Sequence, residues 1–342
     1  MILLIVAIFY YRSRTRARGG GSSRKVDMMR HQNAKPPSDQ TGATGAIEVR
    51  VGDKGAGAVA APKRETGVQQ RQLEVGGAIL HYVEALAESP RGRIVLVHGF
   101  GGDKRDWSGL LRPLMDAGFD ACALDLPGFG ESTPSDEQDW SVTGLLKLLR
   151  LFNRESKTDR LHLIGASLGA TLAACYAYAV PKEVMSLVLI EPLGLRVPYE
   201  TELDKALERG QNPMVVTDEA SFQYQLAFLH ATPPEMPEAV RAARAEAAMA
   251  GHDHQLAAWR ALRDGDRPHI LDAVLPEIQT RTLIVQGASS RVVHTATGNV
   301  ARDTMRAARV VTIPDTGHRP MVEQPAAVTE AVLGFLRGVT GS

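Results

Sequence analysis

Residues 161–171 read Leu-His-Leu-Ile-Gly-Ala-Ser-Leu-Gly-Ala-Thr, and this stretch decides the fold. Its apolar start (161–164) predicts a buried strand, and the alanine-rich segment 170–179 predicts a helix. A Gly-x-Ser-x-Gly sequence between a strand and a helix is typical of a nucleophile elbow, where glycines without a Cβ let the two elements approach closely. We therefore predict that Ser167 is a nucleophile and that the backbone N–H of Leu168 points to the space beside it. The alternative is an ordinary tight turn.

The composition favours a globular enzyme. The chain has 342 residues, 39 basic and 39 acidic side chains, and 44% hydrophobic residues, which is enough for one large α/β domain. Balanced charge argues against nucleic acid as a partner. Cys122 and Cys175 lie in apolar runs and are expected to be buried packing residues. Because the chain has no metal-ligand or dinucleotide-binding spacing, we predict neither a metal nor a cofactor.

The first seventy residues have a different character. Residues 1–11 are almost wholly apolar, and Arg12, Arg14, Arg16 and Arg18 follow. Eleven residues cover about half of a hydrocarbon core that needs roughly 20, and the order is wrong for a signal peptide. We expect 1–11 to be a membrane anchor, either the end of a longer helix or a short interfacial insertion; the alternative is a tail without function. Residues 12–70, basic and then polar, are expected to be a disordered tether, and the rest of the protein to be cytoplasmic.

From residue 71 onward, predicted strands and helices alternate. Segments 73–75 and 78–83 flank Gly76-Gly77 and predict a hairpin. Further strands are predicted at 93–98, 122–126, 161–164, 186–190, 282–285 and 309–313, and helices at 141–152 and 326–336. This alternation predicts a mainly parallel sheet with helices on both faces. Ligands of such sheets bind beyond the carboxyl ends of the strands, where every candidate residue falls.

The segment His98-Gly-Phe-Gly-Gly102 follows a predicted strand directly. Acyl transfer needs a second backbone N–H to hold the developing oxyanion, and a glycine-rich loop beside the elbow allows close approach to the substrate. Phe100 is the predicted donor, paired with Leu168. The alternative is that the glycines only close a tight loop, and His98 is expected to be structural in either case.

The general base is predicted to be His318, which lies in Thr-Gly-His-Arg-Pro (316–320), between the last strand and the last helix. A histidine on that loop can reach over the sheet to Ser167 and exchange a proton near neutral pH. The other histidines are less well placed, because they fall within a strand, in the helical insertion or directly after the penultimate strand.

Together these motifs resemble the α/β-hydrolase superfamily, within it the bacterial lipase and monoacylglycerol-lipase-like branch. The resemblance runs from residue 71 to 338 and is carried by His98–Trp107, Asp125–Ser132, Gly165–Gly169 and Gly317–Pro320 with Glu323 and Pro325. It implies an α/β-hydrolase fold, Ser167 as nucleophile, His318 as base, and Phe100 with Leu168 as oxyanion hole. Members of this branch often carry an N-terminal membrane anchor.

One position departs from the family pattern. The triad aspartate usually follows the strand that ends here at Gly287 by three residues, but this chain has Ser290 there. Glu191 directly follows the strand 186–190, and some α/β-hydrolases place their acid after that strand. We predict Glu191 as the triad acid. In one alternative, Glu191 is only a loop carboxylate bound to backbone amides, and Ser167 and His318 form a weakly active dyad. In the other, Asp315 is the acid.

An insertion between Glu191 and Thr282 is expected to form a helical cap at about 195–278, with helices at 220–229, 237–251 and 256–262. Its apolar side chains either line an acyl pocket or pack the cap on the core; they are Phe222, Leu226, Phe228, Met249 and Trp259. We predict a carboxylic ester hydrolase acting on a small ester or a lipid. Two alternatives remain open: an acyltransferase like the acetoin-complex acetyltransferases, and a catalytically weak relative that lacks the usual aspartate.

Overall fold

The computed structural model describes residues 66–156, 159–263 and 268–340. The predicted anchor (1–11) and most of the predicted tether lie outside these residues. Strand β1 (Gly67–Val75) begins three residues before the predicted end of the tether at residue 70. Among the described helices, none is both long and apolar enough to cross a membrane.

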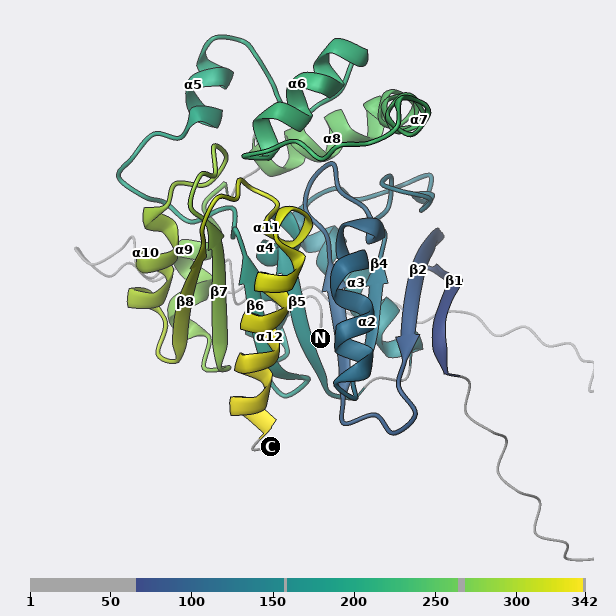
Figure 1. Cartoon of the computed structure of the whole chain (residues 1–342), viewed down its shortest axis with the longest axis vertical. Coiled ribbons are helices and arrows are strands. Elements are labelled where there is room, and N and C mark those ends of the chain that lie inside the picture. Colours follow the sequence, from purple (N-terminus) through teal and green to yellow (C-terminus); the bar gives the residue numbers. More distant parts are fainter. Residues whose placement is uncertain (1–65, 157–158, 264–267, 341–342) are drawn as a thin grey trace, which may run out of the picture. The chain divides into compact units, whose positions relative to one another are not determined.

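In the described residues, the strands form one eight-stranded sheet in the order β1-β2-β4-β3-β5-β6-β7-β8 (Figure 1). The pair β1 and β2 (Ala78–Leu86) is an antiparallel hairpin, and β2 is antiparallel to β4. All later pairs are parallel. The parallel strands are β3 (Arg93–Val97), β4 (Asp120–Leu124), β5 (Leu161–Ala166), β6 (Val184–Ile190), β7 (Thr282–Gly287) and β8 (Ala308–Ile313). The predicted mainly parallel sheet is confirmed.

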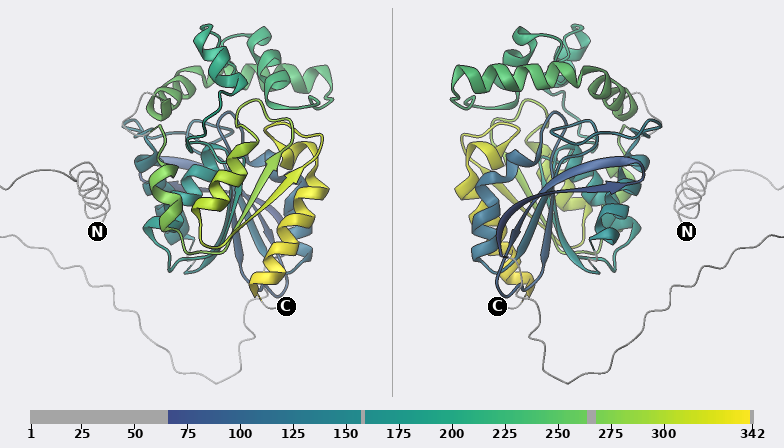
Figure 2. Two further views of the ribbon diagram at one scale, coloured as in Figure 1. Left: turned by 90° about the vertical axis from the view of Figure 1, so that its left-hand side faces the viewer. Right: turned by 90° about the vertical axis from the view of Figure 1, so that its right-hand side faces the viewer.

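Helices cover both faces of the sheet (Figure 2). On one face, α2 (Ser108–Asp116) packs against α12 (Pro325–Thr340); on the other lie α3 (Val142–Glu155), α4 (Leu168–Ala179), α9 (Leu271–Val274) and α10 (Ala296–Thr304). The short helices η1 (Lys104–Trp107), η2 (Leu275–Glu277) and α11 (Pro320–Glu323) lie in connections. Buried apolar side chains of α2, α12 and the strands form the main core cluster. This burial is the main stabilising contribution that holds the sheet rigid beneath the site.

Strand β4 ends earlier than its apolar run predicts. The run 122–126 predicted a strand to Leu126, but pairing with β3 stops at Leu124. Beyond Leu124, the N–H of Leu126 donates to His98 Nε2 at 2.9 Å, and the Asp125 carboxylate accepts a hydrogen bond from the Lys104 ammonium. The pairing with β3 ends there because the His98 side chain takes the N–H of Leu126, while the N–H of Asp125 still donates to the His81 carbonyl oxygen of β2 at 2.8 Å.

The cap consists of α5 (Glu202–Glu208), α6 (Glu219–Leu229), α7 (Glu238–Ala250) and α8 (His252–Arg263), inserted between β6 and β7. It lies over the carboxyl ends of the parallel strands (Figure 1). The sequence predicted α6 to α8 but missed α5, which has seven residues and is defined by a capping box between Thr201 and Asp204 rather than by apolar periodicity. Inside the cap, Phe222 and Leu226 pack with Val216 and Ala245.

Candidate active site

Ser167 stands at the turn between β5 and α4 in a strained backbone conformation, with φ 52° and ψ −114°. Such a conformation costs about 1–3 kcal/mol and persists only where the surroundings enforce it. A Cβ on Gly165 would lie 2.1 Å from the Gly169 carbonyl oxygen, and a Cβ on Gly169 would lie 2.1 Å from the Val97 carbonyl oxygen. The two glycines are therefore required by the close approach of strand, turn and helix.

The glycine-rich loop after β3 lies against this elbow. A Cβ on Gly99 would come within 2.8 Å of the Ser167 Cβ, so the loop approaches the serine as closely as backbone allows. Leu168 is the first residue of α4, where a helix leaves its N–H groups without an intrahelical partner. Phe100 and Leu168, the predicted oxyanion donors, thus belong to two backbone segments that meet at Ser167. Their role as donors stays a prediction.

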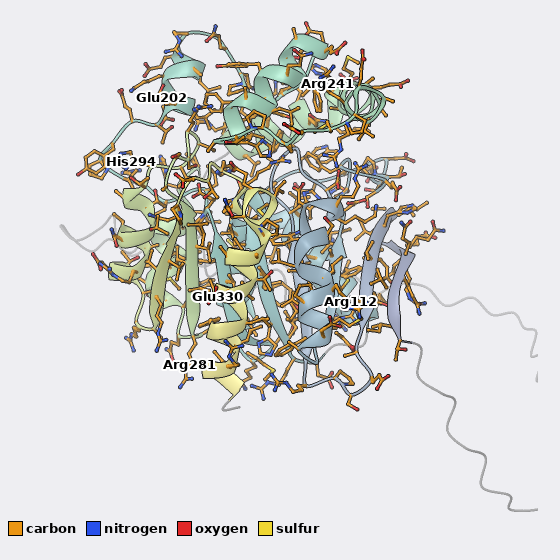
Figure 3. All side chains as sticks on the ribbon, in the orientation of Figure 1. Arg112, Glu202, Arg241, Arg281, His294 and Glu330 are labelled. Atoms are coloured by element: carbon orange, nitrogen blue, oxygen red, sulfur yellow. The ribbon has the colours of Figure 1, made fainter. Side chains whose placement is uncertain are left out.

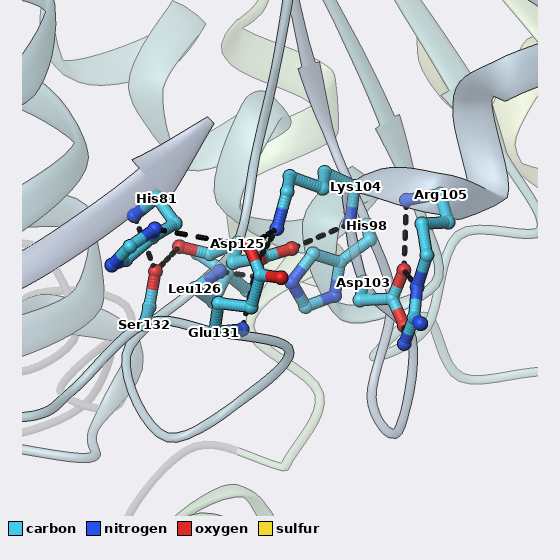
Figure 4. Close-up of polar contacts among 9 residues, drawn as sticks. All are labelled: His81, His98, Asp103, Lys104, Arg105, Asp125, Leu126, Glu131 and Ser132. Atoms are coloured by element: carbon cyan, nitrogen blue, oxygen red, sulfur yellow. Dashed lines mark hydrogen bonds and ion pairs between the residues drawn. The ribbon is translucent and has the colours of Figure 1, made fainter. Parts of the chain in front are cut away.

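His98 fixes this loop and is structural, as predicted. Its Nε2 accepts the N–H of Leu126 at 2.9 Å, so the ring proton lies on Nδ1, which donates to the Gly99 carbonyl oxygen at 2.7 Å. The imidazole, drawn in Figure 4, is buried with both nitrogens satisfied. It has no capacity left for proton transfer.

His318 lies on the loop between β8 and α11, and this loop is tied to the cap. The N–H of His318 donates to the Leu229 carbonyl oxygen at 2.8 Å. Glu323 accepts from the N–H of Gly317 at 2.8 Å through one oxygen and from the N–H of Ala231 at 2.7 Å through the other. Burial raises the pKa of Glu323, while these backbone donors oppose the rise. Glu323 therefore holds the histidine loop against the end of α6.

Glu191 directly follows β6 and supports His318. Its Oε2 lies 3.0 Å from His318 Nδ1, and its Oε1 accepts the N–H of Gly287 at 2.7 Å. The side chain is buried, and φ at Glu191 is 50°, a second strained residue at the site. The structure thus joins the predicted residues Glu191 and His318, and it ties Ser167 to the residue before Glu191 through the bond from the Ser167 N–H to the Ile190 carbonyl oxygen at 2.8 Å.

Two other acid positions were considered from the sequence. Ser290 lies at the family's usual position, and its Oγ is 3.4 Å from the same His318 Nδ1. A hydroxyl there offers a weak neutral contact in place of a carboxylate. Asp315 is exposed and also has a positive φ, 56°. The geometry favours Glu191 over both; its catalytic role stays a prediction.

Two buried polar atoms at the centre of the site have no hydrogen-bond partner among the described residues: Ser167 Oγ and His318 Nε2. Buried polar atoms without partners are rare and call for an explanation. Ser167 and His318 each keep a free polar atom, although Glu191 holds the other nitrogen of the His318 ring. The arrangement is suited to receive a reacting group between them.

A charge cluster, in which Lys104 and Asp125 are buried and Glu131 is exposed, lies next to the glycine-rich loop (Figure 4). The Lys104 ammonium contacts Asp125 and Glu131 at 2.6 Å each, and Asp125 also accepts the N–H of Lys104. Burial lowers the pKa of Lys104, but its hydrogen bonds to Asp125 and Glu131 outweigh this and raise it. Lys104, Asp125 and Glu131 all lie in the motifs named from the sequence, but no role was predicted for them. They tie η1 to the turn after β4 and so hold the glycine-rich loop in place.

Asp106 and Arg319 form a second pair that the sequence missed. Arg319 Nη1 lies 3.4 Å from Asp106 Oδ1, so the residue after His318 is linked to η1. Burial raises the pKa of Asp106, and Arg319 opposes that rise. His230, at the end of α6, is also buried; burial lowers its pKa to about 4, with Arg319 adding to the shift. Asp106 and Arg319 lie within motifs of the sequence, but no sequence signal marks their pairing or the burial of His230, because these residues are brought together only by the packing of cap, loop and η1.

The chain matches the alpha/beta hydrolase family over residues 94–331. It is 27% identical to Lipase 1 of Psychrobacter immobilis, covering 67% of this chain and 72% of that protein. It is 22% identical to a monoacylglycerol lipase of Xenopus laevis (80% and 84% covered) and 29% identical to the acetyltransferase component of the acetoin cleaving system of Pseudomonas putida (79% and 70% covered).

Among solved structures, a membrane phospholipase A described as a bacterial virulence factor superposes with a TM-score of 0.76 and 33% identity, covering 81% of this chain and 88% of that one. The predicted resemblance to lipase-like α/β-hydrolases is confirmed. The fold, the elbow and the family match agree: the chain belongs to the α/β-hydrolase family.

Proposed function

We propose that this protein is a serine hydrolase that cleaves carboxylic esters, of lipid or other acyl type, through an acyl-enzyme. The observation that carries the proposal is the pair of buried, unpartnered atoms Ser167 Oγ and His318 Nε2, with Glu191 held against the far side of the imidazole. Ser167 attacks the ester carbonyl while His318 takes its proton, and the N–H groups of Phe100 and Leu168 hold the oxyanion.

His318 then returns the proton to the leaving alcohol, and the acyl-enzyme forms. Water attacks the acyl-enzyme in the second half, with His318 again as base, and the acid is released. Glu191 keeps the imidazole proton on Nδ1 and stabilises the imidazolium formed in both halves. One oxyanion donor is worth about 3–4 kcal/mol of barrier, so two converging N–H groups supply a substantial share of the rate.

An acyl or lipid substrate is supported by the relatives, which are named lipases, a monoacylglycerol lipase and a phospholipase A. An acyltransferase remains the second candidate, because the acetoin-system acetyltransferase component is 29% identical to this chain and would use the same nucleophile. We also propose that residues 1–11 attach the protein to a membrane surface. These residues are apolar and precede four arginines.

The decisive experiment compares wild type with Ser167→Ala on p-nitrophenyl esters of increasing chain length and on a fluorophosphonate probe. We expect wild type to be labelled and to hydrolyse the esters, and the variant to lose both. Labelling that survives the substitution would refute the nucleophile. An inert wild type would favour the weak relative, and faster product formation with an added alcohol or thiol acceptor would favour the transferase.

A further inference from the structure

A cavity of about 470 Å³ lies between the cap and the carboxyl ends of the strands, and its lining includes Thr171, four residues after Ser167, and Pro192, which follows Glu191. Its volume falls in the range of about 300–1,000 Å³ that is typical of small-molecule sites. The lining comes from the segment after β6, the start of α5, the end of α8 and the segment after β7. His294, labelled in Figure 3 at the level where cap and sheet meet, is one of its lining residues.

The inner end of the cavity is buried and mostly apolar. Thr171 lies one turn after Ser167 on α4 and donates its hydroxyl to the Leu193 carbonyl oxygen at 2.5 Å, so its polar group is satisfied. Trp259 is buried and contacts the Phe100 ring edge-on, with ring centroids 5.5 Å apart. The inner end therefore borders both the nucleophile helix and the predicted oxyanion loop. Of the five apolar cap residues considered from the sequence, Trp259 lines this cavity, whereas Met249 is exposed.

The outer end is polar and charged. The charged residues among its described lining are Arg196, Arg263 and Asp204. The Arg263 guanidinium lies 5.8 Å from the Trp259 ring centroid, which places it over the apolar inner wall. Two guanidinium groups therefore border a wall that is continuous with the apolar part, and one carboxylate lies near each of them, Asp272 near Arg196 and Asp204 near Arg263.

Within the part of the chain that the structure describes, the ion pairs of both arginines are long. Arg263 is 3.7 Å from Asp204, and Arg196 Nε is 3.8 Å from Asp272, beyond ordinary hydrogen-bond distance. The other Asp204 oxygen is held by Thr201 in the capping box at the start of α5. Exposed pairs of this kind contribute about 0–1 kcal/mol, so a bound anion can compete with them. Planar guanidinium groups are well matched to carboxylate and phosphate.

We propose that this cavity selects esters whose chain ends in an anionic group, a carboxylate or a phosphate. The apolar part of the chain lies against Trp259 and Val293, and the anion binds between Arg196 and Arg263. This inference rests on the proposed function and names its substrate class. The shared chemistry is an anion separated from the scissile ester by an apolar stretch, on either the acyl or the alcohol side.

The test compares two pairs of esters of equal chain length. On the acyl side, p-nitrophenyl hydrogen suberate is compared with p-nitrophenyl octanoate; on the alcohol side, oleoyl lysophosphatidic acid is compared with monooleoylglycerol. In at least one pair, we expect the kcat/KM of the anionic ester to be about tenfold above that of its neutral twin, mainly because the anionic ester has the lower KM. The preference should shrink at high salt, because exposed charges are screened.

Arg196→Gln and Arg263→Gln should each reduce the preference severalfold, because each variant should lower kcat/KM for the anionic ester by more than for its neutral twin. Arg260→Gln is the matched control, since Arg260 is exposed on the same helix but does not line the cavity. Equal or higher kcat/KM for the neutral twin in both pairs would overturn the inference while leaving the hydrolase intact. A preference that survives both substitutions would overturn it as well. Hydrolysis of none of the four esters would contradict the proposed function itself.

Discussion

Replacing Glu191 by glutamine removes one charge from the site and should nearly abolish turnover. Gly287 donates its N–H to Oε1 at 2.7 Å, so the amide oxygen of glutamine must take this position to avoid two facing donors. The amide NH₂ then faces His318 Nδ1, which lies 3.0 Å from Oε2 in the wild type. The imidazole is forced to carry its proton on Nε2, where it cannot accept the proton of Ser167.

The size of the effect follows from the geometry. A unit charge pair at the observed 3.0 Å interacts by about 5.5 kcal/mol at an effective dielectric constant of about 20. That energy stabilises the imidazolium in the transition state and corresponds to about 10⁴ in rate, the same order as the loss of a triad carboxylate elsewhere. We therefore expect kcat to fall by about 10³–10⁴, with KM nearly unchanged.

The assay is steady-state hydrolysis of a short p-nitrophenyl ester, with the rate of fluorophosphonate labelling as a second readout. Ser290→Ala is the matched control, because Ser290 Oγ approaches the same nitrogen, at 3.4 Å, without a charge. It should be nearly silent, and Ser290→Asp should partly restore activity to Glu191→Gln. A Glu191→Gln enzyme within tenfold of wild type would refute the reasoning and support a Ser–His dyad.

The other predictions concern stability and attachment. Asp125→Asn leaves the buried Lys104 ammonium with one partner and should lower the free energy of unfolding by about 3 kcal/mol in urea titrations; a loss below 1 kcal/mol would contradict a structural role. Burial lowers the pKa of His162, in β5, and of His230 to about 4. Between pH 6.5 and 4 the unfolded chain therefore binds more protons than the folded chain, so the free energy of unfolding falls as the pH falls. Between pH 7 and 5, each histidine should lower the free energy of unfolding by at most about 2 kcal/mol. Replacing either histidine by glutamine should flatten the slope of the measured free energy of unfolding against pH. A chain that begins at Arg64 should keep full activity on soluble esters and no longer sediment with membranes; equal sedimentation of both chains would rule out the anchor. That start spares β1, which begins at Gly67.

The positions of Ser167 and His318 in the fold were predictable because both residues lie in local motifs. The elbow around Ser167 depends on two close backbone approaches, and each needs glycine, so the requirement is written into consecutive residues. His318 could be placed by its position after the last strand. Glu191 was predicted only because the usual position holds Ser290, and the deciding observation, a carboxylate oxygen 3.0 Å from Nδ1, joins residues 127 positions apart.

The supporting residues could not be read from the chain in the same way. Glu323 was visible within a motif, but its role depends on Ala231, which belongs to the far end of the cap. The link between Asp106 and Arg319 spans 213 positions and has no local pattern. The cavity joins the start of α5 to the segment after β7, and α5 itself was missed. Such features arise from tertiary packing, which periodicity does not encode.

One imidazole nitrogen is reached from the ends of two adjacent strands. Glu191 follows β6 and Ser290 follows β7, and both approach His318 Nδ1. An evolving lineage can therefore acquire a second carboxylate at one position before it gives up the first, and pass from one arrangement to the other without an inactive ancestor. In this fold a carboxylate that contacts this histidine can therefore follow either strand. The serine has no alternative position, because its strained turn depends on the two glycines beside it.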